Sequence, residues 1–272
     1  MEKKYLKLLI IFMVSITLSA FTEAPKESKK VNPIHAQTVI TQNTEEPHWS
    51  YEGETGPPYW GQLDPSFASC EKGREQSPIP IESSLKEGQK ELDAIKGQYQ
   101  PAAVMLLNTG HAIQADVTAP NNKIRIDGKV YNLLQFHFHN PSEHKINGKQ
   151  YPMEIHFVHQ DEHQRIVVLG VMIEEGKENG EISALLKNLD HDRKMTIDIK
   201  KLIPSQSRVF QYNGSLTTPP CTEGVKWVVL NTPLELSQEQ IHAFGEFYQN
   251  NNRPLQPLHK REIMVGSFRQ NK

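Results

Sequence analysis

Two short stretches of the sequence decide the fold: QFHFH at residues 135–139 and EIHFV at residues 154–158. In both, apolar residues alternate with polar ones, and a strand sends successive side chains to opposite faces of its sheet. The apolar residues of each stretch can therefore enter a core while the histidines face the other way. We expect two neighbouring strands that present imidazoles to one side.

The chain from about residue 48 onward is predicted to be one strand-rich domain. Apolar residues recur mostly at period two in short runs, separated by turn pairs such as Asp127-Gly128, Asn147-Gly148 and Asn213-Gly214. No repeat and no second domain is indicated. Helical spacing occurs at 181–189 and after a capping-box pattern at 237–240. The predicted strands include 104–107, 112–117, 123–126, 133–139, 154–159, 166–173 and 225–230.

The histidines have the spacing of a metal site. His137 and His139 lie two apart on one strand, and an antiparallel partner brings His156 beside them. Three imidazoles leave the fourth tetrahedral position open, which is typical of catalytic rather than structural zinc. Gln135 and Glu154 each precede a histidine by two residues and are placed to accept its second ring N–H. On this spacing alone, solvated surface histidines with a solvated amide and carboxylate remain the alternative.

The N-terminus has the pattern of a targeting segment. Three lysines within the first seven residues precede an apolar run at 8–20, which is short for a membrane span. We predict a signal peptide at 1–24, with an uncleaved anchor as the alternative. Residues 25–46 are polar and predict a flexible linker, and 47–272 form the folded domain. The sequence does not choose between cleavage after Ala20, Ala24 or Ala36.

Charge and cysteine content narrow the function classes. The formal net charge of −2 argues against nucleic acid as the main partner, because phosphate binding needs a basic face. The chain has two cysteines, Cys70 and Cys221. In an exported protein these predict a single disulfide, with two buried free thiols as the alternative.

The sequence resembles the alpha-class carbonic anhydrases, especially the exported bacterial type, over roughly residues 48–270. The family's motifs occur in the family's order, which makes chance similarity very improbable. They are HWSY at 48–51, QSPI at 76–79, QFHFH at 135–139, SEH at 142–144, EIHFVH at 154–159, GSLTTPPC at 214–221 and NRPLQP at 252–257.

The resemblance implies a fold and a reaction. The fold is mainly β: a large twisted, mostly antiparallel central sheet with zinc at the base of a conical cleft. The reaction is reversible hydration of carbon dioxide to bicarbonate and a proton, through a zinc-bound hydroxide. The family pattern makes His137, His139 and His156 the Zn²⁺ ligands, with Gln135 and Glu154 as their hydrogen-bond partners.

The resemblance also assigns other roles. Thr217 would orient the hydroxide and donate a hydrogen bond to Glu143. His111 would be the proton shuttle, and Tyr51 would help to order the intervening water. Cys70 and Cys221 match the cysteine pair of exported bacterial members. The residues that match the family's substrate pocket are Val158, Val168, Leu216, Thr218 and Trp227; valines and tryptophans in strands are also ordinary core residues.

The resemblance further implies inhibition by sulfonamides and anions, weak esterase side activity, a homodimer, and a periplasmic or extracellular location. Three rival functions are weighed: a binding protein that has lost catalysis, a zinc hydrolase acting on esters, and a zinc-storage module. A family member without catalysis typically lacks a ligand histidine, whereas all three stand here. Storage would leave the Thr217–Glu143 pair without a purpose.

Overall fold

The computed structural model describes residues 48–82, 94–119, 121–189 and 194–271. They belong to one compact unit, Glu46–Lys272. The predicted signal peptide at 1–24 and linker at 25–46 lie outside the described residues. Among the helices of the described residues, none combines the length and apolar character needed to cross a membrane.

The described residues form one large sheet and one small one. The large sheet has eleven strands in the order β11-β3-β4-β6-β5-β2-β14-β12-β13-β10-β9. Within it only β10–β13 and β14–β2 pair in parallel, which confirms the mostly antiparallel sheet. Its strands are β2 (Ile95–Gln98), β3 (Pro101–Asn108), β4 (Ile113–Val117), β5 (Lys123–Ile126), β6 (Lys129–His139), β9 (Met153–Gln160), β10 (Ile166–Glu175), β11 (Lys194–Asp198), β12 (Gln206–Ser215), β13 (Glu223–Leu236) and β14 (Met264–Gln270).

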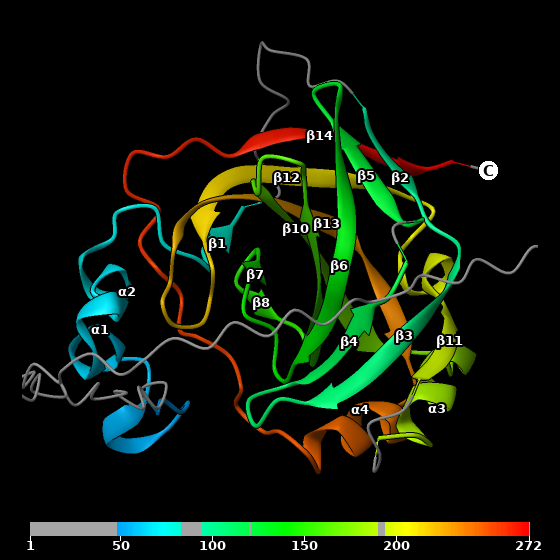
Figure 1. Ribbon diagram of the computed structural model, residues 1–272, viewed down its shortest axis with the longest axis horizontal. Coiled ribbons are helices and arrows are strands. Elements are labelled where there is room, and N and C mark those ends of the chain that lie inside the picture. Colours follow the sequence, from blue (N-terminus) through cyan, green and yellow to red (C-terminus); the bar gives the residue numbers. More distant parts are fainter. Residues whose placement is uncertain (1–47, 83–93, 120, 190–193, 272) are drawn as a thin grey trace, which may run out of the picture. The chain divides into compact units, whose positions relative to one another are not determined.

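Short elements surround this sheet (Figure 1). The small sheet consists of β1 (Pro80–Ile81), β7 (Lys145–Ile146) and β8 (Lys149–Gln150). The α-helices are α1 (Trp60–Leu63), α2 (Ser69–Lys72), α3 (Gly180–Leu186) and α4 (Gln238–Gly245), and 3-10 turns cover Gly53–Thr55, Pro65–Phe67 and Ile199–Leu202. The prediction of a mainly β fold with few short helices is therefore confirmed.

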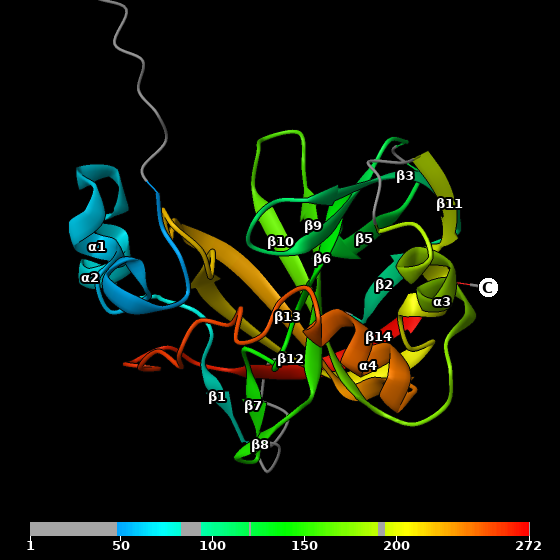
Figure 2. The same cartoon turned by 90° about the horizontal axis from the view of Figure 1, so that it is seen from below.

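Strand β6 is the junction of the large sheet. One of its edges pairs with β9, and its other edge pairs first with β5 and then with β4. Strands β6, β9 and β10 consequently run side by side (Figure 2). On their other edges β5 pairs with β2 and β10 pairs with β13. Together with the β6–β9 pairing, the strands therefore close a ring, β6-β5-β2-β14-β12-β13-β10-β9. This ring fixes β6 and β9 from both sides.

The two faces of β6 have different surroundings. Leu133, Phe136 and Phe138 are buried in the main hydrophobic cluster. A register shift against β9 lies between Leu133 and Gln135. Such an irregularity re-aims the side chains that follow it, and after it the histidines of β6 lie on the face opposite to the two phenylalanines.

Two of the three predicted turn pairs are turns. Asp127-Gly128 links β5 to β6 and Asn147-Gly148 links β7 to β8, with positive φ at all four residues. The prediction for Asn213-Gly214 is wrong, because both residues lie inside β12. The glycine has another cause here. A Cβ at Gly214 would lie 2.1 Å from Ser77 Oγ, so this position needs a glycine for close approach rather than for a turn.

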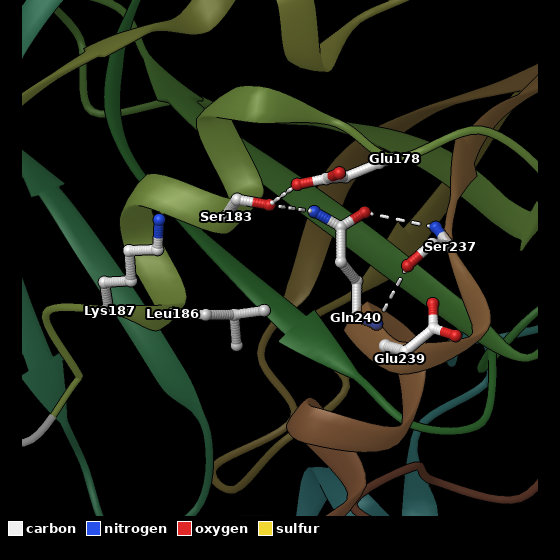
Figure 3. A pocket seen from close by; sticks show the side chains of 7 residues that line it. All are labelled: Glu178, Ser183, Leu186, Lys187, Ser237, Glu239 and Gln240. Atoms are coloured by element: carbon white, nitrogen blue, oxygen red, sulfur yellow. Dashed lines mark hydrogen bonds between the residues drawn. The ribbon is translucent and has the colours of Figure 1, made fainter.

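The two predicted helices are confirmed, with one boundary changed. Ser237 and Gln240 form the capping box at the start of α4. The helix predicted at 181–189 is α3, which ends at Leu186. Gln240 also ties the helices together, because its Nε2 donates to Ser183 Oγ at 2.8 Å and to Asn179 O at 2.7 Å. Figure 3 draws this side chain between Ser183 and Ser237 at the edge of a surface pocket.

A buried histidine of the core makes stability depend on pH. His159 Nδ1 donates to Phe157 O at 2.9 Å, so its Nε2 accepts from the Tyr99 hydroxyl at 2.9 Å. Burial lowers the pKa of His159 from 6.5 to about 3. Below pH 6.5 the His159 imidazole is therefore protonated in the unfolded chain but stays neutral in the folded chain until the pH approaches 3. The stability linked to His159 is complete above pH 6.5 and is lost as the pH falls toward 3.

We predict that the unfolding free energy of His159→Gln depends less on pH than that of the wild type. Between pH 6.5 and 4 the difference between the two should shrink by about 1.4 kcal/mol per pH unit. Urea unfolding at a series of pH values measures this. His242→Gln, at a side chain that is 76% exposed, is the control and should run parallel to the wild type. Parallel curves for all three proteins would contradict the account.

Candidate metal centre

The register of β6 against β9 brings three histidines together. His137 is the direct partner of His156, and His139 is the partner of Glu154. The ring centroids lie 5.0 Å apart for His137 and His139, 5.3 Å for His137 and His156, and 4.5 Å for His139 and His156. One ring nitrogen from each residue lies within 4.8 Å of the others. The predicted convergence is therefore present in the geometry.

Each of the three imidazoles is held by its other nitrogen. His137 Nδ1 donates to Gln135 Oε1 at 2.8 Å, and His156 Nε2 donates to Glu154 Oε1 at 2.9 Å. These are the two partners predicted from the sequence. His139 Nδ1 donates to the backbone carbonyl of Asn251 at 2.7 Å. These bonds fix the tautomers and leave Nε2 of His137, Nδ1 of His156 and Nε2 of His139 for a common ligand.

The free nitrogens fit a metal ion. His139 Nε2 is buried and has no hydrogen-bond partner among the described residues. A buried polar atom without a partner costs about 1–3 kcal/mol, and coordination of a metal would remove that cost. Three neutral imidazoles with one position left over are the donor set of a catalytic zinc site.

The protonation of the cluster also suits a metal ligand set. Burial and the neighbouring imidazoles lower the pKa of His137 well below 6.5, and burial lowers that of His139. Burial opposes the charge on His156 as well, but Glu154 and Glu143 outweigh it and raise the His156 pKa. Imidazoles must be neutral to bind a metal, and two of the three are kept neutral by their surroundings.

Glu154 is the hub of the hydrogen bonds around the cluster. Its Oε2 accepts the backbone N–H groups of Glu143 and His144 at 2.9 and 2.8 Å. Its Oε1 accepts from His144 Nδ1 at 2.8 Å, besides His156. Burial alone would raise the pKa of this carboxyl, but His144 and His156 bring it well below 4.5. The carboxylate is therefore ionised and fully occupied.

The second group with metal-ligand chemistry, His144, Glu154 and His156, is not a competing site. Its nitrogens and oxygen already satisfy one another at 2.8 and 2.9 Å. A metal there would have to displace these bonds, whereas His139 Nε2 has none to lose.

Several residues of this network were not predicted as site residues. His144 Nε2 is hydrogen-bonded to the Tyr212 hydroxyl at 2.7 Å, and Tyr212 donates to Ser77 Oγ at 2.9 Å. Gly170, the β10 partner of His156, leaves the space that Glu154 occupies, since a Cβ there would lie 2.9 Å from Glu154 Oε1. The QSPI and SEH motifs contain Ser77 and His144, but their spacing did not indicate these contacts.

Asn251 is a further residue that was not predicted. Its carbonyl orients His139, its Nδ2 donates to the carbonyls of Phe138 and His111 at 3.0 and 3.1 Å, and its Oδ1 accepts from the Asn140 N–H at 2.7 Å. It thereby joins the end of β6 to the segment that carries His111. An orienting backbone carbonyl leaves no mark in a sequence.

An apolar row lies beside the histidines. Val158, Val168 and Trp227 are direct cross-strand partners on β9, β10 and β13. Trp227 also lies edge-on to His156, with centroids 4.8 Å apart. Leu216 packs against the same hydrophobic cluster. Four of the five predicted pocket residues are thus gathered in one cluster, and Thr218 lies two residues beyond Leu216 in the loop between β12 and β13.

Glu143 lies at the cluster, and Thr217 is buried near the end of β12. Glu143 Oε2 is 3.7 Å from His139 Nε2 and 3.9 Å from His156 Nδ1, while its Oε1 accepts the Arg253 N–H at 2.8 Å. In the described part of the chain, no hydrogen bond joins Thr217 to Glu143, and Glu143 Oε2 has no partner. The predicted contact between the two residues stays a prediction.

The two residues predicted for proton transfer lie in an aromatic group. His111 stacks on Trp49, with ring centroids 3.6 Å apart and planes 12° apart, and Trp49 also contacts Tyr51 at 5.4 Å. Partial burial and His48 lower the pKa of His111. Burial and the Glu143 carboxylate raise the pKa of Tyr51 well above 10.0. His111 therefore stays neutral and able to accept a proton near pH 7.

The two cysteines form a disulfide, as predicted. Cys70 follows the start of α2, and Cys221 closes the loop after β12. Arg253 stabilises the segment around Cys70, because its Nη2 donates to Cys70 O at 2.9 Å and its Nη1 donates to Gln76 Oε1 at 2.8 Å. The loop that carries Thr217 is thus tied to α2 covalently.

Comparison with known proteins identifies the family. The model of the eukaryotic-type carbonic anhydrase family matches residues 55–267. A carbonic anhydrase of Pectobacterium carotovorum is 38% identical over 228 residues, covering 81% of this chain and 92% of that protein. One of Neisseria gonorrhoeae is 40% identical over 223 residues, covering 80% of this chain and 87% of that protein. The chain belongs to the eukaryotic-type, or alpha, carbonic anhydrase family.

Solved structures agree with this assignment. The alpha-carbonic anhydrase of Thermovibrio ammonificans, in complex with the inhibitor sulfanilamide, has a TM-score of 0.74 and 41% identity over 80% of this chain and 98% of that one. Dioscorin complexed with ascorbate also has a TM-score of 0.74, at 30% identity over 83% of this chain and 99% of that one. Dioscorin and the carbonic anhydrases share this fold, so the fold alone does not determine the activity, which depends on the residues of the site.

We predict that Glu154→Gln weakens zinc binding by about 10–100-fold, because an amide NH₂ must then face groups that are themselves donors. Chelator competition on the folded variant, verified by circular dichroism, measures the zinc affinity. Glu174→Gln, at an exposed carboxylate that contacts Lys149, is the matched control and should bind zinc as the wild type does. Unchanged affinity in a folded Glu154→Gln protein would refute the role given to Glu154.

Proposed function

We propose that the protein is a zinc enzyme that catalyses the reversible hydration of carbon dioxide to bicarbonate and a proton. The observation that carries the proposal is the group of three converging imidazoles, two of them buried and His139 Nε2 without a hydrogen-bond partner among the described residues, beside the apolar row of Val158, Val168 and Trp227. A family member acting only as a binding protein has no need of this pairing of metal ligands and apolar wall.

His137, His139 and His156 would hold the ion through Nε2, Nε2 and Nδ1. Zinc in such a site acidifies water at its open position and supplies a nucleophile near neutral pH, an effect for which carbonic anhydrases are the standard example. Gln135, Glu154 and the Asn251 carbonyl keep the three rings aimed at one point. Carbon dioxide is apolar, so Val158, Val168, Leu216 and Trp227 would form its wall.

Thr217 and Glu143 would orient the nucleophile. The buried Glu143 carboxylate only accepts hydrogen bonds when ionised, and its Oε2 is without a partner in the described residues. A Thr217 hydroxyl turned toward that oxygen would donate to it and accept a hydrogen bond from the nucleophile. The disulfide at Cys221 would hold this loop in position, with Thr218 on its substrate side.

His111 would carry the proton away. Imidazole is the side chain best suited to carrying protons near neutral pH, and the partly buried ring of His111, stacked on Trp49, remains partly open to buffer. Tyr51, whose raised pKa keeps its hydroxyl protonated, would order the water between the site and His111.

The disulfide and the sequence pattern of the N-terminus support an exported protein. The Cys70–Cys221 bond indicates an oxidising compartment. Together with the signal-peptide pattern at 1–24 and the polar linker at 25–46, it supports export to the periplasm or the outside of the cell, with 47–272 as the enzyme domain. We further propose a homodimer, inhibition by sulfonamides and anions, and weak esterase activity from the same nucleophile.

We predict that His139→Ala loses both zinc and carbon dioxide hydration, because one of three ligands is removed. Metal analysis and stopped-flow hydration measure the two properties on the same sample. His242→Ala, at an exposed histidine of α4, should keep both. Wild-type activity in His139→Ala at wild-type zinc content would refute the proposed function, as would an efficiency on an activated ester above that on carbon dioxide in the wild type.

We predict that His111→Ala keeps its zinc and slows turnover at least several-fold in weak buffer, because proton release loses its carrier. Added imidazole should restore the rate, while His259→Ala should behave as the wild type. A rate in weak buffer equal to that of the wild type would remove His111 from the proton path.

A further inference from the structure

A row of positive charges crosses the sheet at strands β5, β2 and β14. Arg125 of β5 is the direct partner of Lys96 of β2, and Lys96 is in turn the partner of Arg269 of β14. These three strands lie side by side (Figure 1). Direct cross-strand neighbours on one face have Cβ atoms about 5 Å apart, and like charges there are destabilising. The row therefore costs stability unless something neutralises it.

A small pocket lies beside this row. Its volume is ≈ 80 Å³, and its lining includes Gln98 and Lys123, which are the next cross-strand pair on the same face. Asn271 lines it too, held against β2 by a hydrogen bond from its N–H to Gly97 O at 2.8 Å. The full lining is Lys96, Gln98, Lys123, Arg125, Val130 and Asn271.

The cations of this pocket have no anionic partner in the described part of the chain. The ion pairs of the described residues involve other groups, and none includes Lys96, Lys123 or Arg125. Arg125 Nη1 donates to Gly128 O at 3.1 Å, which steadies the guanidinium and leaves its other N–H groups available. The uncharged neighbours of these cations are Gln98 and Asn132, which are cross-strand partners of Lys123, and Val130, which is the partner of Arg125. Neither they nor Asn271, which lines the same pocket, are acidic.

We propose that this pocket binds a dianionic oxyanion of the phosphate or sulfate type. A guanidinium fork and two ammonium groups are the usual partners of such groups, and the two side-chain amides add neutral donors. The volume equals that of about two to three waters, which suits one oxyanion group and is too small to enclose a sugar or a base. Two negative charges would neutralise the opposed Lys96–Arg125 pair.

The site is separate from the proposed catalytic centre. It lies on β2 and β5, with Val130 of β6 and with Asn271, and it includes none of the proposed histidine ligands or their hydrogen-bond partners. Phosphate bound at the histidine cluster would be unaffected by changes at Lys96 and Arg125, so the two kinds of binding can be told apart.

The test is a calorimetric titration of the full-length protein with inorganic phosphate at fixed ionic strength. We expect the wild type to show saturable, one-to-one binding in the millimolar range, and Lys96→Gln/Arg125→Gln to bind at least tenfold more weakly. Lys72→Gln/Arg74→Gln removes the same two charges at exposed positions near α2 and should bind as the wild type does. Because the first variant removes a repulsion, it should unfold at no lower temperature than the wild type.

Equal phosphate affinity in the wild type and in Lys96→Gln/Arg125→Gln would overturn the proposal, as would equal losses in both double variants. A titration with short-chain polyphosphate identifies the source of the oxyanion. If polyphosphate binds more tightly than phosphate, and only Lys96→Gln/Arg125→Gln loses this binding, the pocket binds a phosphate group carried on a chain. Equal binding, lost in the same variant, would assign it to the free ion.

Discussion

The pairing of β6 with β9 is the constraint on which the site depends. Because the side chains of a strand alternate, a slip of one residue in this register would send His156 into the core and Phe157 to the face that carries the histidines. The register is held on several sides: Phe136 is opposite Phe157 and Phe138 is opposite Ile155, all within the main core. The pairing with β10 then brings Gly170 opposite His156, and so makes room for the Glu154 carboxylate.

Electrostatics reinforce this arrangement. A buried carboxylate costs several kcal/mol in lost hydration, and Glu154 offsets that cost with four hydrogen bonds, two from backbone N–H groups of the segment after β6 and two from imidazoles. Glu143 is buried a few ångströms away with one oxygen bonded and the other free. The Glu154 carboxylate, with all its hydrogen bonds made, suits a structural role. The Glu143 carboxylate, with Oε2 available to accept a hydrogen bond, suits a functional one.

Much of this could be predicted from local pattern. Alternation in β6 and β9 indicated which residues face the core, and the pair of histidines in β6 indicated a metal site. The capping box of Ser237 and Gln240 could be predicted because its two residues are only three positions apart. Contacts between residues far apart in the sequence could not be predicted in this way. Examples are the Asn251 carbonyl that orients His139 and the close approach of Ser77 to Gly214, each of which joins residues more than a hundred positions apart. A glycine required for close approach, such as Gly214, cannot be distinguished in a sequence from a glycine required for a turn.

The central claim is that His137, His139 and His156 share one zinc ion with a position left for water. A crystal structure of the zinc-loaded protein, with anomalous scattering at the zinc edge, tests it most directly. The account predicts one zinc ion bound to Nε2 of His137, Nε2 of His139 and Nδ1 of His156 at about 2.0–2.1 Å, with its fourth position open to solvent. Zinc bound instead by His144 and Glu154, or a protein side chain in the fourth position, would contradict it.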